Sequence, residues 1–523
     1  MHPSRLLLLA TAACSVAALT VPSVASADTA AGGSDRSFVT TAVDTKDLNV
    51  AEPSINVAPD GAIYIAGPSG FGGVRAPIQA PDQVADQEFG GDLLWRSDDG
   101  GATWKYLQSY DGTFGGGDSD ITSAPNGTIY ASGLYLACVT VAASTDRGEH
   151  WVNNPAGCTN EGGLDDRQWN DVDGNQAVVT AFGGLTGLGF TRSVVSTGAV
   201  VNGPVIPVDG GDDYQWPGVV AVDQNTGTSY VVWNTDHSED NNDCDHVGDD
   251  GDDTTCDDPM SAQHSDDIRI AAIPRGATTS PTFVTVAADR DDTFDAFVDV
   301  DVDKAGNVYV VWNERHPDVQ ETWTLLSTSS DGGHTWSDPV KVNSTPKTTV
   351  FPWVSAGDDG RIAVSYYGTD ATGYSPEVIA GNPNWYVYSS YSTDGGKTFT
   401  EYQTTPNYLH QGSVCTSGTG CDTGTRDLLD FFETDYDAQG CLVTAYADNS
   451  RDTVGADGKR TNDKGTIVSA VHQTAGPGLL ADTDCNAPSA NLAEVPSTAL
   501  LGMVAALVFA AIYAVRRRRL VRA

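Results

Sequence analysis

The chain has 523 residues and a formal net charge of −42, from 70 acidic and 28 basic side chains. Nucleic-acid binders concentrate positive charge, so this balance excludes a nucleic acid as the obvious partner, and a hydrophobic content of 40% excludes a disordered chain. The acids comprise 59 aspartates and 11 glutamates, and because aspartate favours turns whereas glutamate favours helices, this ratio predicts an architecture with little helix.

The first 27 residues have the features of a secretory signal peptide. Arg5 supplies the positive start, an apolar run begins at Leu6, and residues 25–27 form a small-residue cleavage site. An exported chain that begins near Asp28 would keep eight of the nine cysteines, which predicts disulfides. Many pairings are open; pairing neighbours along the chain would give Cys138–Cys158, Cys244–Cys256, Cys415–Cys421 and Cys441–Cys485.

A repeated pattern runs through the middle of the chain. Each copy has an alternating apolar strand, a polar turn that contains glycine, and a second strand of β-branched and aromatic residues, which predicts a β-hairpin. A third apolar strand follows the hairpin, as at residues 92–97, 266–273 and 465–471. The seven copies begin at Glu52, Asp118, Asp166, Tyr214, Asp295, Phe351 and Asp430.

A second pattern, Ser-x-Asp-x-Gly-x-x-Trp/Phe, follows four of the hairpins. The Asp side chain is expected to cap backbone amides of its own turn, the glycine to take a positive φ, and the aromatic ring to pack between sheets. The residues predicted to have these structural roles are Ser97, Asp99, Gly101, Trp104, Ser144, Asp146, Gly148, Trp151, Ser329, Asp331, Gly333, Trp336, Ser392, Asp394, Gly396 and Phe399.

These four segments resemble the Asp-boxes, or BNR repeats, of sialidase-like β-propellers. The resemblance implies an all-β fold in which residues 36–474 form a ring of four-stranded antiparallel blades. Seven hairpins favour seven blades, and six, the number in sialidases, is the alternative. The strand at 37–43 has no hairpin of its own and could complete the last blade, which would remove open sheet edges.

Strand direction sorts the loops between the two faces of such a ring. The near face, as we call it, contains the starts of the inner strands and the loops that follow the second strands. The far face contains the hairpin turns and the Asp-boxes. Because long loops such as residues 67–92 and 234–265 belong to the near face, we expect that face to carry the function.

Three kinds of side chain are candidates for a site on the near face. Carboxyls at the starts of inner strands could provide a general acid for glycoside cleavage, namely Asp118, Asp120 or Asp166. Aromatic rings could stack on a sugar, namely Trp169, Trp216 and Trp353. Since sialidases clamp the sugar carboxylate with arginines, the resemblance implies substrate binding by Arg75, Arg167, Arg315 and Arg426.

Each of these assignments has an alternative. The arginines could pair with the surplus acid, and aromatic residues of the inner strands could fill a central channel. The arginine-containing Phe/Tyr-Arg-Ile-Pro motif of sialidases also has no counterpart, since residues 52–55 read Glu-Pro-Ser-Ile. Binding and catalysis therefore stay separate predictions.

Residues 236–258 form an insert with ten aspartates in 23 positions. Such a density of like charge requires solvation or a bridging cation, and Asp243, Asp245 and Asp249 could bind calcium. The spacing does not match an EF-hand, and a solvated loop is the alternative. No other cofactor is expected.

The C-terminal part has the features of a membrane anchor. Residues 498–515 form an uncharged stretch of 18 residues that is followed by four arginines. As a helix this stretch would span ~27 Å, close to the thickness of a bilayer core. It predicts a transmembrane helix with a stalk at 475–497 before it and a cytoplasmic basic tail at 516–523 after it.

Together these features predict a propeller anchored in a bacterial cell membrane and exposed outside the cell. It would bind a glycan or glycoconjugate at its near face, and it could hydrolyse this ligand as a glycosidase. The alternative is a non-catalytic propeller that binds a protein partner or mediates calcium-dependent adhesion at the cell envelope.

Overall fold

The computed structural model describes residues 35–45, 48, 50–68, 91–107, 110, 116–135, 138–153, 165–184, 187–196, 199–208, 215–235, 265, 267–279, 281–288, 290, 293, 297–373, 375–416, 427–451 and 465–486. The predicted signal peptide, Asp-rich insert and C-terminal anchor lie outside these residues. Within the described ranges, no helix has the length and apolar character needed to cross a bilayer.

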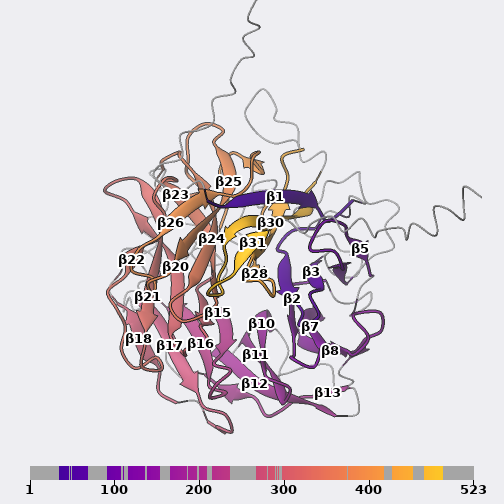
Figure 1. Ribbon diagram of the computed structural model, residues 1–523. Helices are drawn as coiled ribbons and strands as arrows, with labels where there is room; N and C mark the ends of the chain where they lie inside the picture. Colours follow the sequence, from indigo (N-terminus) through magenta and orange to yellow (C-terminus); the bar gives the residue numbers. More distant parts are fainter. Residues whose placement is uncertain are drawn as a thin grey trace, which may run out of the picture.

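Strands of successive chain segments form antiparallel sheets (Figure 1). The first sheet contains β2 (Ser54–Val57), β3 (Ile63–Pro68), β4 (Asp92–Ser97) and β5 (Lys105–Tyr106). The second contains β6 (Ser119–Ser123), β7 (Ile129–Tyr135), β8 (Cys138–Ser144) and β9 (Val152–Asn153). The third contains β10 (Asp166–Asp173), β11 (Ala177–Gly184), β12 (Gly187–Ser196), β13 (Ala199–Val201) and β14 (Ile206–Pro207). The fourth contains β15 (Gln215–Val222), β16 (Ser229–Thr235), β17 (Asp267–Ile273) and β18 (Val284–Ala287).

A nine-stranded sheet and a five-stranded sheet follow. The nine-stranded sheet has two antiparallel parts, and the strand pairing between them is a single parallel pair, Thr322 with Thr348. Its first part contains β19 (Asp299–Val302), β20 (Val308–His316), β21 (Glu321–Ser329) and β22 (Val340–Lys341). Its second part contains β23 (Thr348–Ala356), β24 (Ile362–Thr369), β25 (Asn384–Ser392), β26 (Thr400–Gln403) and β27 (His410–Gln411). The last sheet contains β28 (Thr434–Tyr436), β29 (Leu442–Asp448), β30 (Ile467–Pro477), β31 (Asp484–Asn486) and β1 (Ser37–Ala42).

The first strands of these groups form a closed ring at the centre of the molecule. Each packs against the next in the order β2, β6, β10, β15, β19, β23, β28 and again β2. In Figure 1 the labels of β2, β10, β15 and β28 lie near the middle of the view, and later strands such as β12 and β18 lie farther out. The protein is therefore an all-β propeller, as the sequence predicts.

The N-terminal strand closes the ring, and this prediction is confirmed. β1 pairs antiparallel with β30, from Ser37 opposite Ala475 to Ala42 opposite Ser469. Without β1, β30 would present unpaired backbone groups along its outer edge. The first and last described strands of the propeller are thus held in one sheet.

The four Ser-x-Asp-x-Gly turns form on the far face with one geometry. In the first, the Ser97 hydroxyl donates to the Asp99 carboxylate (2.8 Å) and accepts the Gly101 amide (2.9 Å), and Gly101 has φ of 84°. The same bonds recur from Ser144 to Gly148, from Ser329 to Gly333 and from Ser392 to Gly396. The following aromatic residues pack against buried apolar clusters, as predicted; they are Trp104, Trp151, Trp336 and Phe399.

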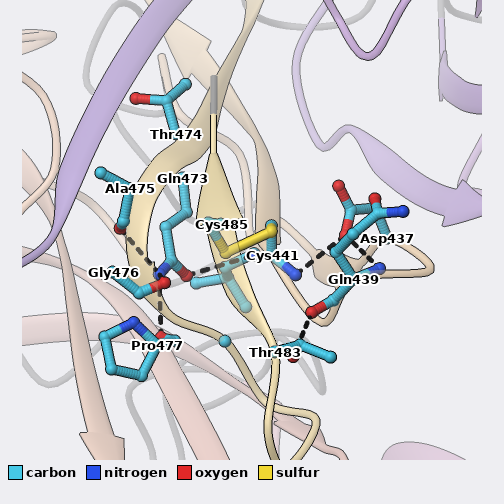
Figure 2. The surroundings of a disulfide bond; sticks show 12 residues. Asp437, Gln439, Cys441, Gln473, Thr474, Ala475, Gly476, Pro477, Thr483 and Cys485 are labelled. Carbon is cyan, nitrogen blue, oxygen red and sulfur yellow. Dashed lines mark hydrogen bonds between the residues drawn. A yellow bond between two sulfur atoms is a disulfide. The ribbon is translucent and has the colours of Figure 1, made fainter. Parts of the chain in front are cut away.

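The last sheet extends beyond the predicted end of the propeller at residue 474. β31 pairs with β30 within the segment predicted to be a stalk, and a disulfide joins Cys485 of β31 to Cys441 (Figure 2). This pairing was among the predicted ones. The Gln473 side chain donates to the carbonyls of the last three residues of β30, 2.9–3.3 Å away. The disulfide accounts for the longer propeller, because Cys485 can bond to Cys441 only if the chain after β30 comes back to the last sheet.

Gly440 makes this return possible. It lies in the far-face turn between β28 and β29 with φ of 80°, and a Cβ at this position would lie 2.5 Å from the Leu480 amide nitrogen. Its carbonyl accepts the Leu479 amide at 2.7 Å. Cys138 and Cys415 are also disulfide-bonded, and their predicted partners lie outside the described residues.

Replacing Cys441 and Cys485 by serine is expected to lower the free energy of unfolding by about 4 kcal/mol. The disulfide closes a loop with a sequence separation of 44, and the loop-closure entropy of the unfolded chain sets this magnitude. Denaturant unfolding of the variant and the oxidised parent measures the difference. Because other disulfides are present, reduction of the parent is not an equivalent test. A loss below about 1 kcal/mol would show that β31 is held without the disulfide.

Candidate functional site

Side chains that alternate along the inner strands form three layers on the axis of the ring. The first lies at the near-face ends of the inner strands and contains Arg167. The second contains aromatic rings, beginning two residues further along β10 with Trp169. The third is a cavity lined by carboxyls, which begins at Asp171 on the same strand.

Arg167 holds together three carboxylates from three other chain segments. Its guanidinium pairs with Glu52 (3.2 Å), Asp118 (3.3 Å) and Asp430. Only 4% of the arginine side chain is exposed, and the guanidinium carbon also lies 4.8 Å from the centre of the Phe297 ring. Each acid comes from the start of a different inner strand, so this ion-pair network connects opposite parts of the ring.

The backbone at this network adopts a conformation that is rare outside glycine. Glu52 has φ of 48° and Arg167 has φ of 55°, and the left-handed region costs a non-glycine residue about 1 kcal/mol or more. The Glu52 carboxylate also accepts the backbone amide of Asp430 at 2.9 Å. These bonds supply the free energy that keeps both residues in the strained conformation.

Below the network, four aromatic rings form a plug. Trp169 meets Phe297 edge to face at 4.9 Å between ring centres and Phe431 at 5.7 Å. Phe431 in turn stacks on Trp353 at 6.5 Å. Trp169 is 1% exposed, so its ring faces cannot receive a sugar. Trp169 therefore fills the central channel, which is the alternative role expected for aromatic residues of the inner strands.

The cavity on the other side of the plug, which we call the carboxylate cavity, has a volume of about 150 Å³. Trp169 and Trp353 form part of its wall. Among its described lining residues there is no Lys, Arg or His. The six acidic residues that line it are Asp120, Asp171, Asp299, Asp301, Glu433 and Asp435.

These six carboxylates join adjacent inner strands. Asp299 accepts the amide of Val354 on β23 at 2.5 Å and the amide of the residue that follows it, Val300, at 2.7 Å. Inner strands of neighbouring groups do not pair as a ladder, so their amides need other acceptors. The other five carboxylates likewise each accept a backbone amide of the neighbouring inner strand. The pairs of acceptor and amide are Asp120 and Asn170, Asp171 and Val222, Asp301 and Ala356, Glu433 and Ile55, and Asp435 and Val57.

Burial raises the pKa values of the carboxyls that line this cavity. It raises the pKa of Asp120 and Asp171 to about 7 and that of Asp299 to about 8, against the opposing effect of the backbone hydrogen bonds. It raises the pKa of Asp435 to about 6 and those of Asp301 and Glu433 well above their ordinary values. Folding therefore favours the protonated forms.

The protein should be more stable at pH 5.5 than at pH 8.5. A carboxyl with a raised pKa in the folded state contributes stability below its unfolded pKa, near 4, and this contribution is lost as the pH rises through the folded values of about 6 to 8. We expect a loss of about 2 kcal/mol or more across this window in denaturant unfolding. Asp299→Asn should reduce the loss, and a stability that rises with pH would contradict the assignment.

The structure brings only some of the predicted site residues together. Asp118 and Arg167 meet in the ion-pair network, Trp169 and Trp353 lie in the plug, and Asp120 lines the cavity below it. Arg315 lies at the near-face end of β20, opposite Thr322, and is 8% exposed. Outside the residues or side chains that the structure describes are Arg75, Arg426, Asp166, Trp216, Asp243, Asp245 and Asp249.

Another near-face carboxylate, Glu314, is also held by an arginine. Arg290 donates to both of its oxygens, at 2.7 and 2.8 Å, and His316 lies 3.3 Å away. Glu314 is 1% exposed, and the His316 ring stacks on Trp323 at 3.7 Å. This arrangement supports the alternative in which arginines pair with surplus acid.

Five lining acids of the cavity were not predicted as site residues. The signal for them is the alternation itself, since an aromatic residue is followed by acids at every second position. Trp169 is followed by Asp171, Phe297 by Asp299 and Asp301, and Phe431 by Glu433 and Asp435. On a strand these side chains share one face, so the same acids could have been placed on the ring axis.

Comparisons with known proteins assign no family. No family model and no curated protein matches the sequence. Among solved structures, a protein of unknown function from Dyadobacter fermentans is 14% identical, with 84% of this chain and 98% of that chain covered and a TM-score of 0.43. The GH93 α-L-arabinofuranosidase of Fusarium graminearum is 14% identical, covering 64% and 94%, with a TM-score of 0.41. A Hadza microbial sialidase is 13% identical, covering 83% and 68%, with a TM-score of 0.39.

Proposed function

We propose that this chain is an exported propeller that binds a neutral glycan at its near face without hydrolysing it. The observation that carries the proposal is the burial of Arg167 and its pairing with three carboxylates of the protein itself. An arginine with 4% of its side chain exposed and three carboxylates of the protein around it is shielded from the carboxylate of a ligand. Its role is then to join the inner strands.

The absence of catalysis is inferred from the described acids. Glycoside hydrolysis needs two carboxyls on opposite sides of the scissile bond, one of them a proton donor in contact with the sugar. Asp118 is paired with Arg167, and Asp120, whose pKa would suit a proton donor, lies in the cavity below the aromatic plug. Neither is placed to contact a sugar on the near face.

The preference for a neutral ligand follows from charge. The chain carries a formal net charge of −42, which repels acidic sugars over a range set by the ionic strength. The resemblance of the four far-face turns to Asp-boxes supports the choice of a glycan as the ligand class. It also supports membership of the sialidase-like propellers as part of this proposal.

The architecture and location belong to the same proposal. We count the nine-stranded sheet as two blades, because its parts are joined as strands by a single parallel residue pair, and this count would give seven blades. The signal peptide and the apolar segment before the C-terminal arginines support export and anchoring in a bacterial cell membrane. The near face would then be available to ligands outside the cell.

A glycan array tests the proposal. The full chain, labelled and applied at two salt concentrations, should be retained on a subset of neutral glycans and not on sialylated versions of the same glycans. Lowering the salt should weaken retention on acidic glycans further, because repulsion is less screened. Preferential binding to sialylated glycans would overturn the ligand class, and binding to no glycan would overturn the function.

A further inference from the structure

We propose that the carboxylate cavity binds a divalent cation together with its water shell. This site would be distinct from the near face and from the predicted calcium-binding insert, and it does not depend on what the near face binds. It is carried by the six carboxyls of the cavity wall, by acceptors in that wall without a partner, and by the size of the cavity.

The wall of the cavity contains carboxyl groups and, among its described residues, no basic residue. Six carboxyls line about 150 Å³. Arg167 lies beyond the aromatic plug and is already paired with three other acids. Ionising any of these buried carboxyls without a counter-ion is costly, and a cation in the cavity would offset that cost.

Two acceptors of the wall have no protein partner. Glu433 is 2% exposed; its Oε2 accepts the Ile55 amide at 2.9 Å, whereas its Oε1 has no hydrogen-bond partner. Oδ1 of Asn56, from the adjacent inner strand, is likewise without one. Both residues line the cavity. Glu433 is the more deeply buried residue of the two. An unpartnered buried acceptor indicates a donor within the cavity, and water bound to a cation is a strong donor.

The geometry favours contact through water over direct coordination. In the described part of the chain, no group of three or more His, Cys, Asp or Glu side chains could hold a metal ion directly. The reason is that each lining carboxylate is held at the seam between two inner strands by amide hydrogen bonds, as Asp301 is by Ala356 and Val302. A volume of about 150 Å³ has room for several waters. Mg²⁺ releases its water reluctantly and fits this arrangement.

Thermal unfolding of the full chain tests the proposal. Chelator-treated protein is heated at pH 7.5 with MgCl2, with CaCl2, or with NaCl at the same ionic strength. We expect MgCl2 to raise Tm saturably, by about 2 °C or more beyond NaCl. CaCl2 acting alone would point to direct coordination and would overturn the hydrated form of the site. No rise beyond that with NaCl would overturn the site itself.

Variants separate this cavity from the Asp-rich insert. The double variant Asp301→Asn, Glu433→Gln should lose the rise with MgCl2. The triple variant Asp243→Asn, Asp245→Asn, Asp249→Asn should keep it, and the reverse pattern would overturn the proposal. If the double variant does not fold, crystals of the parent soaked in MnCl2 decide: an anomalous peak inside the cavity is expected, and its absence would overturn the proposal.

Discussion

Replacing Arg167 by methionine should lower the free energy of unfolding by about 3–5 kcal/mol. The variant leaves Glu52, Asp118 and Asp430 close together without their shared cation, and removal of one partner from a buried ion pair has this effect in other proteins. The strained backbone at Glu52 would also lose part of its support. Denaturant unfolding followed by tryptophan fluorescence, with Trp169 near the site, measures the change.

Arg147→Met is the matched control for Arg167→Met. Arg147 also pairs with two carboxylates, those of Asp60 and Asp98, but it is 46% exposed on the far face. Exposed ion pairs contribute little, so this variant should unfold close to the parent. Adding Glu52→Gln and Asp430→Asn to Arg167→Met should recover part of the loss, because fewer charges remain uncompensated. Equal effects of Arg167→Met and Arg147→Met would contradict a buried network at the ring centre.

Deleting residues 37–42 should destabilise the propeller by ~4–6 kcal/mol, since the hydrogen bonds between β1 and β30 are lost at roughly 1 kcal/mol each. The exposed edge of β30 should also promote association between molecules. Denaturant unfolding and size-exclusion chromatography measure the two effects. A synthetic peptide with the sequence of residues 35–44, added in trans, should reverse both.

The control for this deletion is a substitution within β1 that keeps its backbone. Val39→Thr changes a side chain that is 52% exposed and retains a residue that favours strands. It should leave unfolding unchanged. A truncated chain that unfolds at the same denaturant concentration as the parent would show that β1 does not hold the ring closed.

The strands and turns could be predicted because their signals are local. Alternation of apolar residues around a glycine turn defines a hairpin, and the Ser-x-Asp-x-Gly spacing defines the far-face turns. The ring closure by residues 37–42 followed from a strand that had no partner in its own segment. Composition alone predicts a stalk at residues 475–497, whereas the Cys441–Cys485 disulfide and the pairing of β31 hold residues 484–486 in the last sheet.

The roles of the site residues depend on contacts between distant segments, which the sequence pattern does not give. Asp118 and Arg167 were both placed at inner-strand starts, but nothing local indicates that Arg167 meets Glu52 and Asp430 as well. Asp120 and Trp169 lie deeper along the axis of the ring than Asp118 and Arg167, and the sequence pattern does not show this depth. The excess of aspartate was attributed to turns, whereas part of it joins the inner strands across the carboxylate cavity.

The most direct test of the central claim is release of a fluorogenic leaving group by the full chain. The substrates are a panel of sialosides, arabinofuranosides and neutral hexosides, assayed from pH 5 to 8, with Arg167→Lys as a parallel sample. Because Arg167 is buried, pairs with Glu52, Asp118 and Asp430 and joins the inner strands, we expect no release above the enzyme-free blank from any substrate. Turnover by the parent that falls in Arg167→Lys while the fold is retained would show that Arg167 binds substrate, and would contradict the account.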